Sequence, residues 1–593
     1  MERKHPDIKN DLIVLQVAGQ LFFLCLTLLS IYFWKERQAF DAAHYLFEII
    51  DRKFFFVAHQ RPIGIVSQVL PVLGVWLHLP LKAIAILYSL GDIIWYYLLF
   101  LLMAYKLETR RGIICLLLIL SLTVRYSFFC PVTELLQGLA LLPVWLCLLD
   151  RTFRFRFPIL ISLMAIIIFS HPLLFYPLVF TFAWWSMMRV EGAKSINSEK
   201  SRLPKILWPT FFISIALKLF LLDSYDHDKT FYPVVYNDYG FLKSLSFETV
   251  FDLMKVIAVN YTITTLLFLV TVAIYGMQRR IKSSLLLIAF VLGYLIIIAA
   301  THRFGGISNY SERMLLPIPL MIAMAAAGII SLSRVFVPKL MSFVGLLLVL
   351  LLHLDVLRIT AKPYTLRVEQ MESLTNMSRK IGIQKAIVDE TLLDQNSFAM
   401  SGWSYPIETL WISALKGPDS CVSVILQHEH VERIAQQKHS VRAHEWVKWT
   451  EVILPISGLN ENYFKLPSES YLSLNELGTS YIDTVRLQIQ SSSKINPHNY
   501  VIAFELSLGK NKALFSSDST YLSLQIPNGP QIRLTVPYTL VDGGILWMEF
   551  PIEAIKNDDR LDVWLKQGSK TLAHEKIYFT NGQFSFAAFE SLR

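Results

Sequence analysis

The segment after the first apolar run, residues 35–64 (KERQAFDAAHYLFEIIDRKFFFVAHQRPIG), is rich in acidic and histidine residues. If a helix begins near Gln38, a period of 3.6 residues separates the polar side chains from the apolar ones. The polar face then comprises Asp41, His44, Tyr45, Glu48 and Asp51, and the apolar face Phe40, Ala43, Phe47 and Ile50. We therefore predict an interfacial helix on the outer membrane surface, with its carboxylates toward water or a cavity. The alternative is that the polar face is merely solvated.

The carboxylates of this face are candidates for general-base chemistry. A carboxylate in this place can act as a general base that takes a proton from a hydroxyl group. An anionic phosphate group bound beside it would require a cation. Arg303 and Arg313, in the segment THRFGGISNYSERMLLP, are candidate cations because guanidinium binds phosphate oxygens in bidentate geometry. The alternative for each arginine is a loop charge that snorkels at the interface.

Further polar side chains are predicted near the outer surface. His59, Arg61 and His171 are, with His44, candidates for substrate binding, and a polar cap at a helix end is the alternative for each histidine. His44, Glu48 and His59 are residue types that bind divalent cations, but their spacing matches neither HExxH nor a closed ligand set. The cofactor is therefore unknown, and a divalent cation stays possible.

Three ionisable residues, Asp92, Glu134 and Lys218, lie within or at the ends of apolar runs. Ionisable groups inside a membrane are functional candidates by default, and solvation at an interface is the alternative for Glu134 and Lys218. The sequence contains no Walker loop, GxSxG elbow or GxGxxG fingerprint. ATP-driven transport and serine hydrolysis therefore lose their usual support.

Composition determines the broad class. Of 593 residues, 54% are hydrophobic and only 17% are charged, and the mean hydropathy is +0.46. Soluble domains have about 25% charged residues, so this composition predicts a membrane protein. The net charge of +9 is spread over short loops between apolar runs, which indicates membrane topology rather than nucleic-acid binding.

The apolar runs are the elements that must position these side chains. We predict about eleven spans, near 12–34, 83–105, 112–129, 132–149, 157–171, 173–188, 206–222, 256–277, 284–300, 316–333 and 340–357. The basic residues between them place the N-terminus in the cytoplasm and everything after about residue 358 outside. The first outer loop, 35–82, contains the predicted amphipathic helix.

After residue 357 the composition becomes that of a soluble protein. Residues 358–466 mix a helix from Thr365 to near Gly382 with short apolar strands, KAIVD and CVSVIL, which predicts an α/β domain. From 467 to 593 the hydrophobic period falls to two, with turn signals such as NGP and DGG between the strands. This second part is predicted to be a β-sandwich.

The membrane part, about 1–357, resembles the GT-C superfamily of polytopic glycosyltransferases. The resemblance consists of a first span, an outer loop opening with the acid of FDAAHYLFEII, many short-looped spans and an extracytoplasmic C-terminal region. It implies a polyprenyl-phosphate-sugar donor and makes Asp41 the catalytic carboxylate. The chain has Asp41-Ala42 where the superfamily commonly has two acids, so Glu48 and Asp51 are kept as substitutes. The resemblance also implies lipid-phosphate contacts from late outer loops, without choosing between Arg303 and Arg313.

The resulting hypothesis is a glycosyltransferase that acts on the extracytoplasmic face, with a glycan, lipid or protein as acceptor and no nucleic-acid partner. A bacterial inner membrane is the expected location. Two alternatives are a transporter of lipid-linked glycans and a non-catalytic assembly protein of an envelope machine. The absence of an internal sequence repeat counts against a transporter.

Overall fold

The computed structural model describes most of the chain between Pro6 and Phe586. The described part omits residues 1–5, 123–124, 193–197, 224–226, 228–246, 302–308, 333–335, 381, 389–401, 427–443, 450–451, 474–479, 483–484, 497–498, 508–519, 526–530, 536–543, 552–559, 568–569, 581–582 and 587–593. The chain divides into two compact units. The first contains Met1–Glu369 together with Asn396–Pro418 and Leu459–Phe464, and the second contains Gln370–Gln395, Asp419–Gly458 and Lys465–Arg593.

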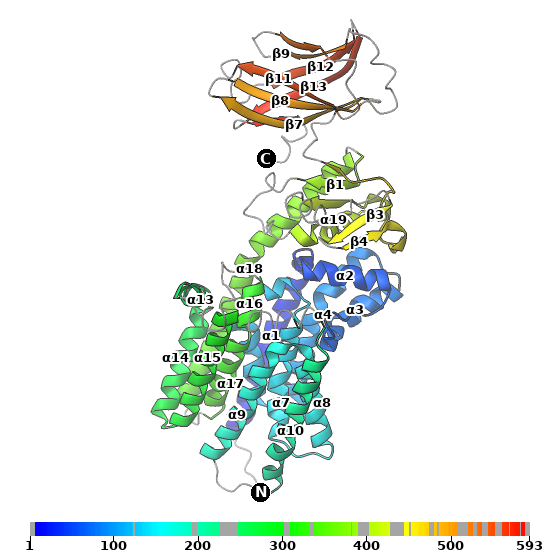
Figure 1. Cartoon of the computed structure of the whole chain (residues 1–593). Helices are drawn as coiled ribbons and strands as arrows, with labels where there is room; N and C mark the ends of the chain where they lie inside the picture. Colours follow the sequence, from blue (N-terminus) through cyan, green and yellow to red (C-terminus); the bar gives the residue numbers. More distant parts are fainter. Residues whose placement is uncertain are drawn as a thin grey trace. The chain divides into compact units, whose positions relative to one another are not determined.

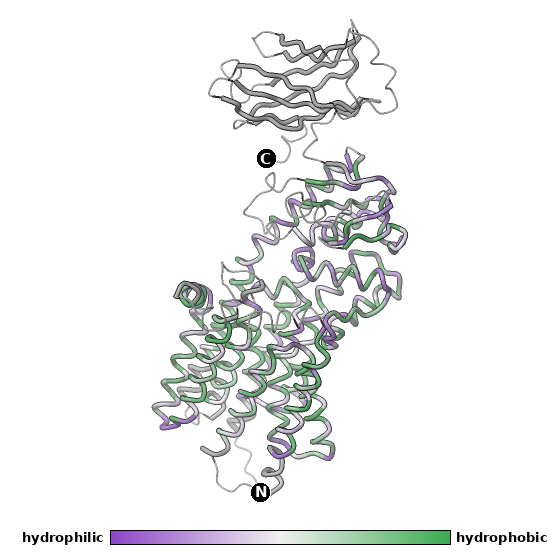
Figure 2. Tube along the Cα trace, in the orientation of Figure 1, coloured by the Kyte–Doolittle hydropathy of each residue, from purple (hydrophilic) through white to green (hydrophobic). Residues whose placement is uncertain are grey.

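The first unit is a bundle of apolar helices (Figure 1). Its helices are α1 (Pro6–Tyr32), α2 (Asp41–Arg52), α3 (Ile65–Trp76), α4 (Leu81–Leu101), α5 (Arg110–Leu122), α6 (Glu134–Leu139), α7 (Leu141–Leu149), α8 (Arg156–Ser170), α9 (Phe175–Gly192), α10 (Ser198–Phe220), α13 (Phe247–Asn260), α14 (Thr262–Met277), α15 (Ile281–Thr301), α16 (Asn309–Leu315), α17 (Pro317–Leu332), α18 (Phe336–Lys380) and α19 (Tyr405–Ala414). Every predicted apolar run contains helix. Figure 2 shows that hydrophobic residues dominate the long parallel helices of this unit.

Among the described residues, five helices are long and apolar enough to cross a membrane, namely Asp11–Tyr32, Leu81–Lys106, Ile281–Ala300, Glu312–Ile329 and Phe343–Lys380. A bent pair, Val250–Ala258 with Thr262–Met277, would make a sixth, and its two helices meet at 91°. The other apolar helices, such as Arg156–Ser170, are shorter than a full span. These helices fit the predicted class of helical membrane protein, and the count of eleven spans stays a prediction.

Close packing holds the bundle together. Helix α5 is buried along Gly112–Leu122 and packs against α17, whose Ala323, Ala325 and Ala327 are fully buried and let the two backbones approach. Helices α3 and α4 approach closely at one point, where a Cβ added at Gly91 would lie 1.9 Å from the Ser67 carbonyl oxygen. Only glycine fits at that contact.

Helix α2 confirms the predicted helix but differs in its start and its surroundings. The chain first makes a short 3₁₀ turn, Glu36–Gln38, and the α-helix begins at Asp41 rather than near Gln38. Its apolar face lies against protein, since α2 packs on α3 and α19 and the Phe47 ring lies 5.4 Å from that of Phe464. The predicted burial of this face in the membrane surface is therefore wrong. An amphipathic pattern specifies an apolar neighbour but does not distinguish protein from lipid.

The predicted boundary at residue 357 falls inside α18, one helix of 45 residues. The predicted α/β domain of 358–466 is divided, because Asn396–Pro418, with α19, and Leu459–Phe464 belong to the first unit. The helix predicted from Thr365 to near Gly382 is the last part of α18, which ends at Lys380.

In the second unit, the strands KAIVD and CVSVIL are confirmed as β1 (Lys385–Val388) and β2 (Ser423–Leu426). They pair in parallel, and β5 (Leu472–Ser473) joins β1 on its other edge, as an α/β arrangement requires. Strands β3 (Glu445–Trp449) and β4 (Val452–Pro455) form a separate antiparallel pair. The helix-like segment expected after Leu426 lies outside the described residues.

The remaining strands form two antiparallel sheets, with orders β10-β9-β12-β13-β14 and β11-β8-β7-β6. They are β6 (Ser480–Ile482), β7 (Val485–Asn496), β8 (Asn499–Ser507), β9 (Thr520–Gln525), β10 (Gln531–Thr535), β11 (Gly544–Pro551), β12 (Arg560–Gln567), β13 (Lys570–Thr580) and β14 (Gln583–Phe586). The all-β character predicted for 467–593 agrees with these sheets.

Candidate functional site

An ion pair between Asp41 and Arg313 forms the centre of the candidate site. Arg313 Nη1 lies 2.7 Å from Asp41 Oδ2, although the two residues are 272 positions apart in the sequence. A second guanidinium nitrogen, Nη2, donates to Cys130 Sγ. The side chains of Asp41 and Arg313 are 39% and 21% exposed, so the pair is accessible rather than sealed in the core. The predicted acid and one of the two predicted cations are thus in direct contact.

A strained residue precedes Asp41. Phe40 has φ 56° and ψ −123°, a backbone conformation that costs a non-glycine residue about 1–3 kcal/mol. Its backbone N–H donates to Glu408 Oε1 at 3.1 Å. Arg367 donates two hydrogen bonds of 2.9 Å to the same carboxylate, and its guanidinium lies over the rings of Phe40 and Tyr405 at 4.5 and 4.8 Å. The Arg367–Glu408 pair therefore fixes the backbone from which Asp41 projects.

One helical turn after Asp41, Tyr45 adds a neutral hydrogen-bonding group. The Tyr45 hydroxyl donates to Glu134 Oε1 at 2.6 Å, and Arg61 Nη1 lies 3.7 Å from Glu134 Oε2. Burial, reinforced by the Glu134 charge, raises the pKa of Tyr45 well above its usual value. Tyr45 therefore keeps its proton at neutral pH and remains a donor.

His171 is a neutral group at the break between α8 and α9. Its Nδ1 accepts a hydrogen bond of 3.1 Å from the Leu173 backbone N–H. A ring nitrogen that accepts this bond carries no proton, so the imidazole is neutral in this arrangement. Arg61, Arg313, Lys218 and His59 all lie near enough to His171 to interact with it electrostatically, so basic side chains gather around this point.

His59, predicted to bind substrate, has a carboxylate partner. Its Nδ1 lies 2.8 Å from Asp223 Oδ2, beyond the end of α10. This contact joins the segment 35–82 to a second segment of the chain 164 residues later.

The other predicted carboxylates of α2 have partners of their own. Glu48 is buried and contacts Arg52 at 2.5 Å and His44 at 3.9 Å. Asp51 accepts a hydrogen bond of 3.1 Å from the Asn460 backbone N–H, and burial raises the pKa of the Asp51 carboxyl. Asp51 thus attaches the segment Leu459–Phe464 to α2. Of the three acids of this helix, Asp41 is therefore the one that pairs with Arg313.

Two predictions about this site have separate outcomes. Arg303 lies outside the described residues. The trio of His44, Glu48 and His59 does not assemble into a metal site, because no group of three His, Cys, Asp or Glu side chains with that geometry occurs in the described part of the chain.

Some residues of the site were not predicted. The helix period places Tyr45 on the polar face of the predicted helix and Glu134 lies in a predicted span, but no local pattern pairs them. Cys130 lies between two predicted spans, and nothing in the local sequence marks it as a site residue. Arg367 and Glu408 left no signal, because a buried ion pair between positions 41 residues apart has no local pattern.

Asp92 and Lys218, the other two ionisable residues of the predicted spans, contact neighbouring protein side chains. Asp92 pairs with the fully buried Arg37 at 2.6 Å, and Arg37 also donates to Ser89. The Lys218 ammonium lies 5.8 Å from the centre of the Phe169 ring.

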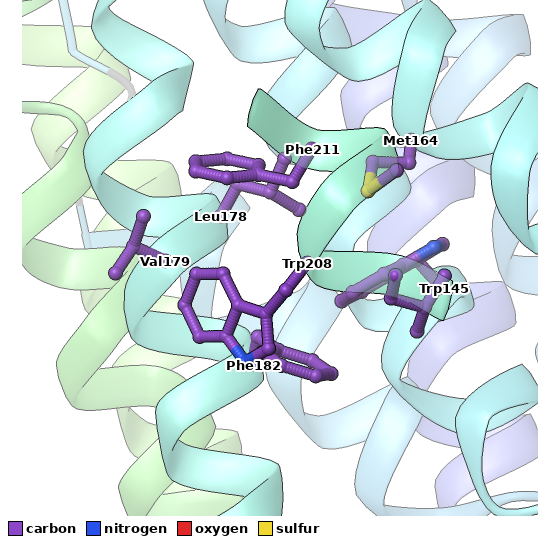
Figure 3. Close-up of a pocket in the computed structure, with 8 residues that line it drawn as sticks. Trp145, Met164, Leu178, Val179, Phe182, Trp208 and Phe211 are labelled. Carbon is purple, nitrogen blue, oxygen red and sulfur yellow. The ribbon is translucent and has the colours of Figure 1, made fainter. Parts of the chain in front are cut away.

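An enclosed void among α7, α8, α9 and α10 is lined by Trp145, Met164, Leu178, Val179, Phe182, Leu207, Trp208 and Phe211 (Figure 3). Its volume of about 10 Å³ and its apolar lining make it a packing defect rather than a ligand site.

No family model, curated protein or solved structure matches this chain, so its function is argued from the geometry of the site.

Proposed function

We propose that the protein is a glycosyltransferase that moves a sugar from a polyprenyl-phosphate donor to an acceptor on the extracytoplasmic face of the membrane. The observation that supports this most directly is the contact of Asp41 with Arg313 at the outer loops of an apolar helical bundle. A base and a phosphate-binding cation in contact are the two groups that inverting transfer from a phosphate requires.

The ion pair also provides a way to keep the base inactive until the donor arrives. In the absence of donor, Asp41 and Arg313 neutralise each other. Among the described residues, the buried Nε of Arg313 has no hydrogen-bond partner, so the contacts with Asp41 and Cys130 leave this N–H of the guanidinium unpaired. A donor phosphate that binds Arg313 in bidentate geometry competes with Asp41 and releases its carboxylate.

The chemical step then follows from the released carboxylate. Asp41 takes the proton of the acceptor hydroxyl, and the acceptor oxygen forms a bond to the anomeric carbon from the face opposite the phosphate. The bond between that carbon and the phosphate oxygen breaks, and its electron pair leaves with the phosphate, whose charge Arg313 stabilises. The products are a glycoside of inverted configuration and polyprenyl phosphate. The proton on Asp41 passes to water.

Replacement of Arg313 by alanine is expected to weaken donor binding roughly ten- to a hundredfold, because a charge-assisted hydrogen bond contributes about 1.5–3 kcal/mol. Arg313→Lys should recover part of this affinity, since it restores the charge but not the bidentate geometry. The measurement is equilibrium binding of a polyprenyl-phosphate sugar to the purified full-length protein. Lys82→Ala, which removes an exposed charge at the start of α4, is the matched control. Unchanged donor affinity in Arg313→Ala would show that the donor phosphate does not bind at Arg313.

The orientation belongs to the same proposal. Eleven spans with a cytoplasmic N-terminus, in a bacterial inner membrane, place the Asp41 loop outside. Reporter fusions after Lys9, Arg280 and Arg593 should report inside, inside and outside. A C-terminal reporter that reads inside would mean that the span count is wrong by one.

A further inference from the structure

A groove of about 800 Å³ runs between α1 and α18, a size typical of ligand sites. It is lined by one stripe from each helix, namely Cys25, Leu28, Leu29, Tyr32 and Phe33 from α1, and Leu354, Arg358, Ala361, Lys362, Thr365, Leu366 and Glu369 from α18. The residues of both stripes recur every three or four positions, as expected for the facing surfaces of two helices.

The two helices run in the same direction along the groove. The rings of Phe22 and His353 lie 6.1 Å apart, and farther along α18 Thr365 Oγ1 donates at 3.2 Å to Oε1 of Glu36, which follows the end of α1. The groove therefore has an apolar end, near Cys25 and Leu28 of α1, and a charged end. Leu28 is 57% exposed on a helix apolar enough to cross a membrane, so this end faces hydrocarbon. An apolar end followed by a charged end matches the shape of an amphiphile.

The order of charges selects the headgroup. Arg358 and Lys362 come first after the apolar end and are one turn apart, while Glu369 lies two turns beyond Lys362, a rise of about 10 Å. Arg358 also contacts Asp355 at 3.0 Å, and Glu36, which accepts from Thr365, adds a second carboxylate at the outer end. A lining with cations near the hydrocarbon and carboxylates farther out is complementary to a zwitterion whose phosphate is inner and whose ammonium is outer. We propose that this groove binds a membrane phospholipid with a phosphoethanolamine headgroup.

An aromatic wall separates this groove from the Asp41–Arg313 pair. Phe33 lines the groove, and its ring packs at 5.7 Å against that of Phe129, which stacks on Tyr364 at 4.6 Å. Tyr364 in turn contacts Phe40, the residue before Asp41, at 6.5 Å. A headgroup in the groove lies behind this wall, so the lipid is a separate ligand and not the sugar donor. The lipid site is independent of the proposed transferase activity.

The test is native mass spectrometry of the full-length protein, purified in detergent and supplied with equal amounts of phosphatidylethanolamine, phosphatidylglycerol and phosphatidylcholine. We expect preferential retention of the ethanolamine lipid, whose ammonium both carries charge and donates hydrogen bonds. The double variant Arg358→Gln, Lys362→Gln should lower this retention by about tenfold or more, because both phosphate contacts are lost. Glu369→Gln should act differently and shift the preference from phosphatidylethanolamine toward phosphatidylglycerol.

Two further variants make the result specific. Leu28→Trp fills the apolar end and should reduce retention of all three lipids without changing their ratio. Lys53→Gln removes an exposed charge outside the groove and should change nothing. Equal retention of the three lipids would show that the protein carries only non-specific surrounding lipid, and this would overturn the proposal. The same conclusion would follow if the Arg358, Lys362 and Glu369 variants behaved like Lys53→Gln. Donor binding is measured separately, so either proposal can fail alone.

Discussion

Asp41→Asn is expected to reduce sugar transfer by about 10²- to 10⁴-fold, the contribution of a general base. The substitution keeps the size of the side chain and an oxygen that can accept from Arg313, but it removes the charge that takes the proton. Expression and folding should be nearly unchanged, because a partly exposed ion pair contributes only about 0–1 kcal/mol. The measurement is initial-rate transfer by the purified protein from a polyprenyl-phosphate sugar.

Donor binding distinguishes this variant from those of Arg313. The Asp41 carboxylate competes with phosphate for the guanidinium, so Asp41→Asn should bind donor at least as tightly as the natural protein. Arg313→Ala should bind it more weakly. A variant that binds donor but does not transfer identifies Asp41 as a base and not as a binding residue.

Glu48→Gln and Asp51→Asn are the matched controls on the same helix, and the structure predicts smaller effects on transfer for both. If Asp41→Asn kept full turnover and either control lost it, the base would lie on this helix but would be Glu48 or Asp51 rather than Asp41. If all three variants were silent in a cellular glycan assay, the non-catalytic assembly hypothesis would replace the transferase.

The second large effect concerns the buried Arg367–Glu408 pair, in which each side chain is 1% exposed. Glu408→Ala leaves the Arg367 charge in the core without its carboxylate, which typically costs about 3–5 kcal/mol. It also removes the acceptor of the Phe40 N–H. We expect a lower unfolding midpoint in a thermal or denaturant scan of the detergent-solubilised protein. Asp419→Asn, which breaks an exposed pair with Lys465, should change the midpoint little.

A double variant separates stability from positioning. Arg367→Met with Glu408→Leu replaces the ion pair by apolar side chains, which is often neutral or stabilising. The strained Phe40 backbone nevertheless loses its acceptor, so Asp41 should be misplaced and transfer should fall while the midpoint recovers. A stable double variant with full transfer would show that the pair supports the fold alone. Glu408→Gln, whose amide oxygen can still accept from Phe40, should retain more transfer than the double variant.

The sequence by itself determined those features that depend on neighbouring residues. Low charge and long apolar runs required a membrane bundle, and a period of 3.6 located the helix that contains Asp41. Alternation predicted the strands of the C-terminal region, and short continuous apolar runs predicted the KAIV and SVIL strands. These signals are local, because a helix or strand repeats its environment every few residues.

Tertiary structure decided what distant segments bring together. Asp41 meets Arg313 across 272 positions, and the Phe40 N–H meets Glu408 across 368. The bend of 91° between α13 and α14 interrupts a run that hydropathy treats as continuous. The apolar face of α2 had the pattern of a membrane surface helix, yet Phe464 covers part of it. Hydrophobic burial has no direction, so a sequence specifies that a face is covered, and only packing specifies whether protein or lipid covers it.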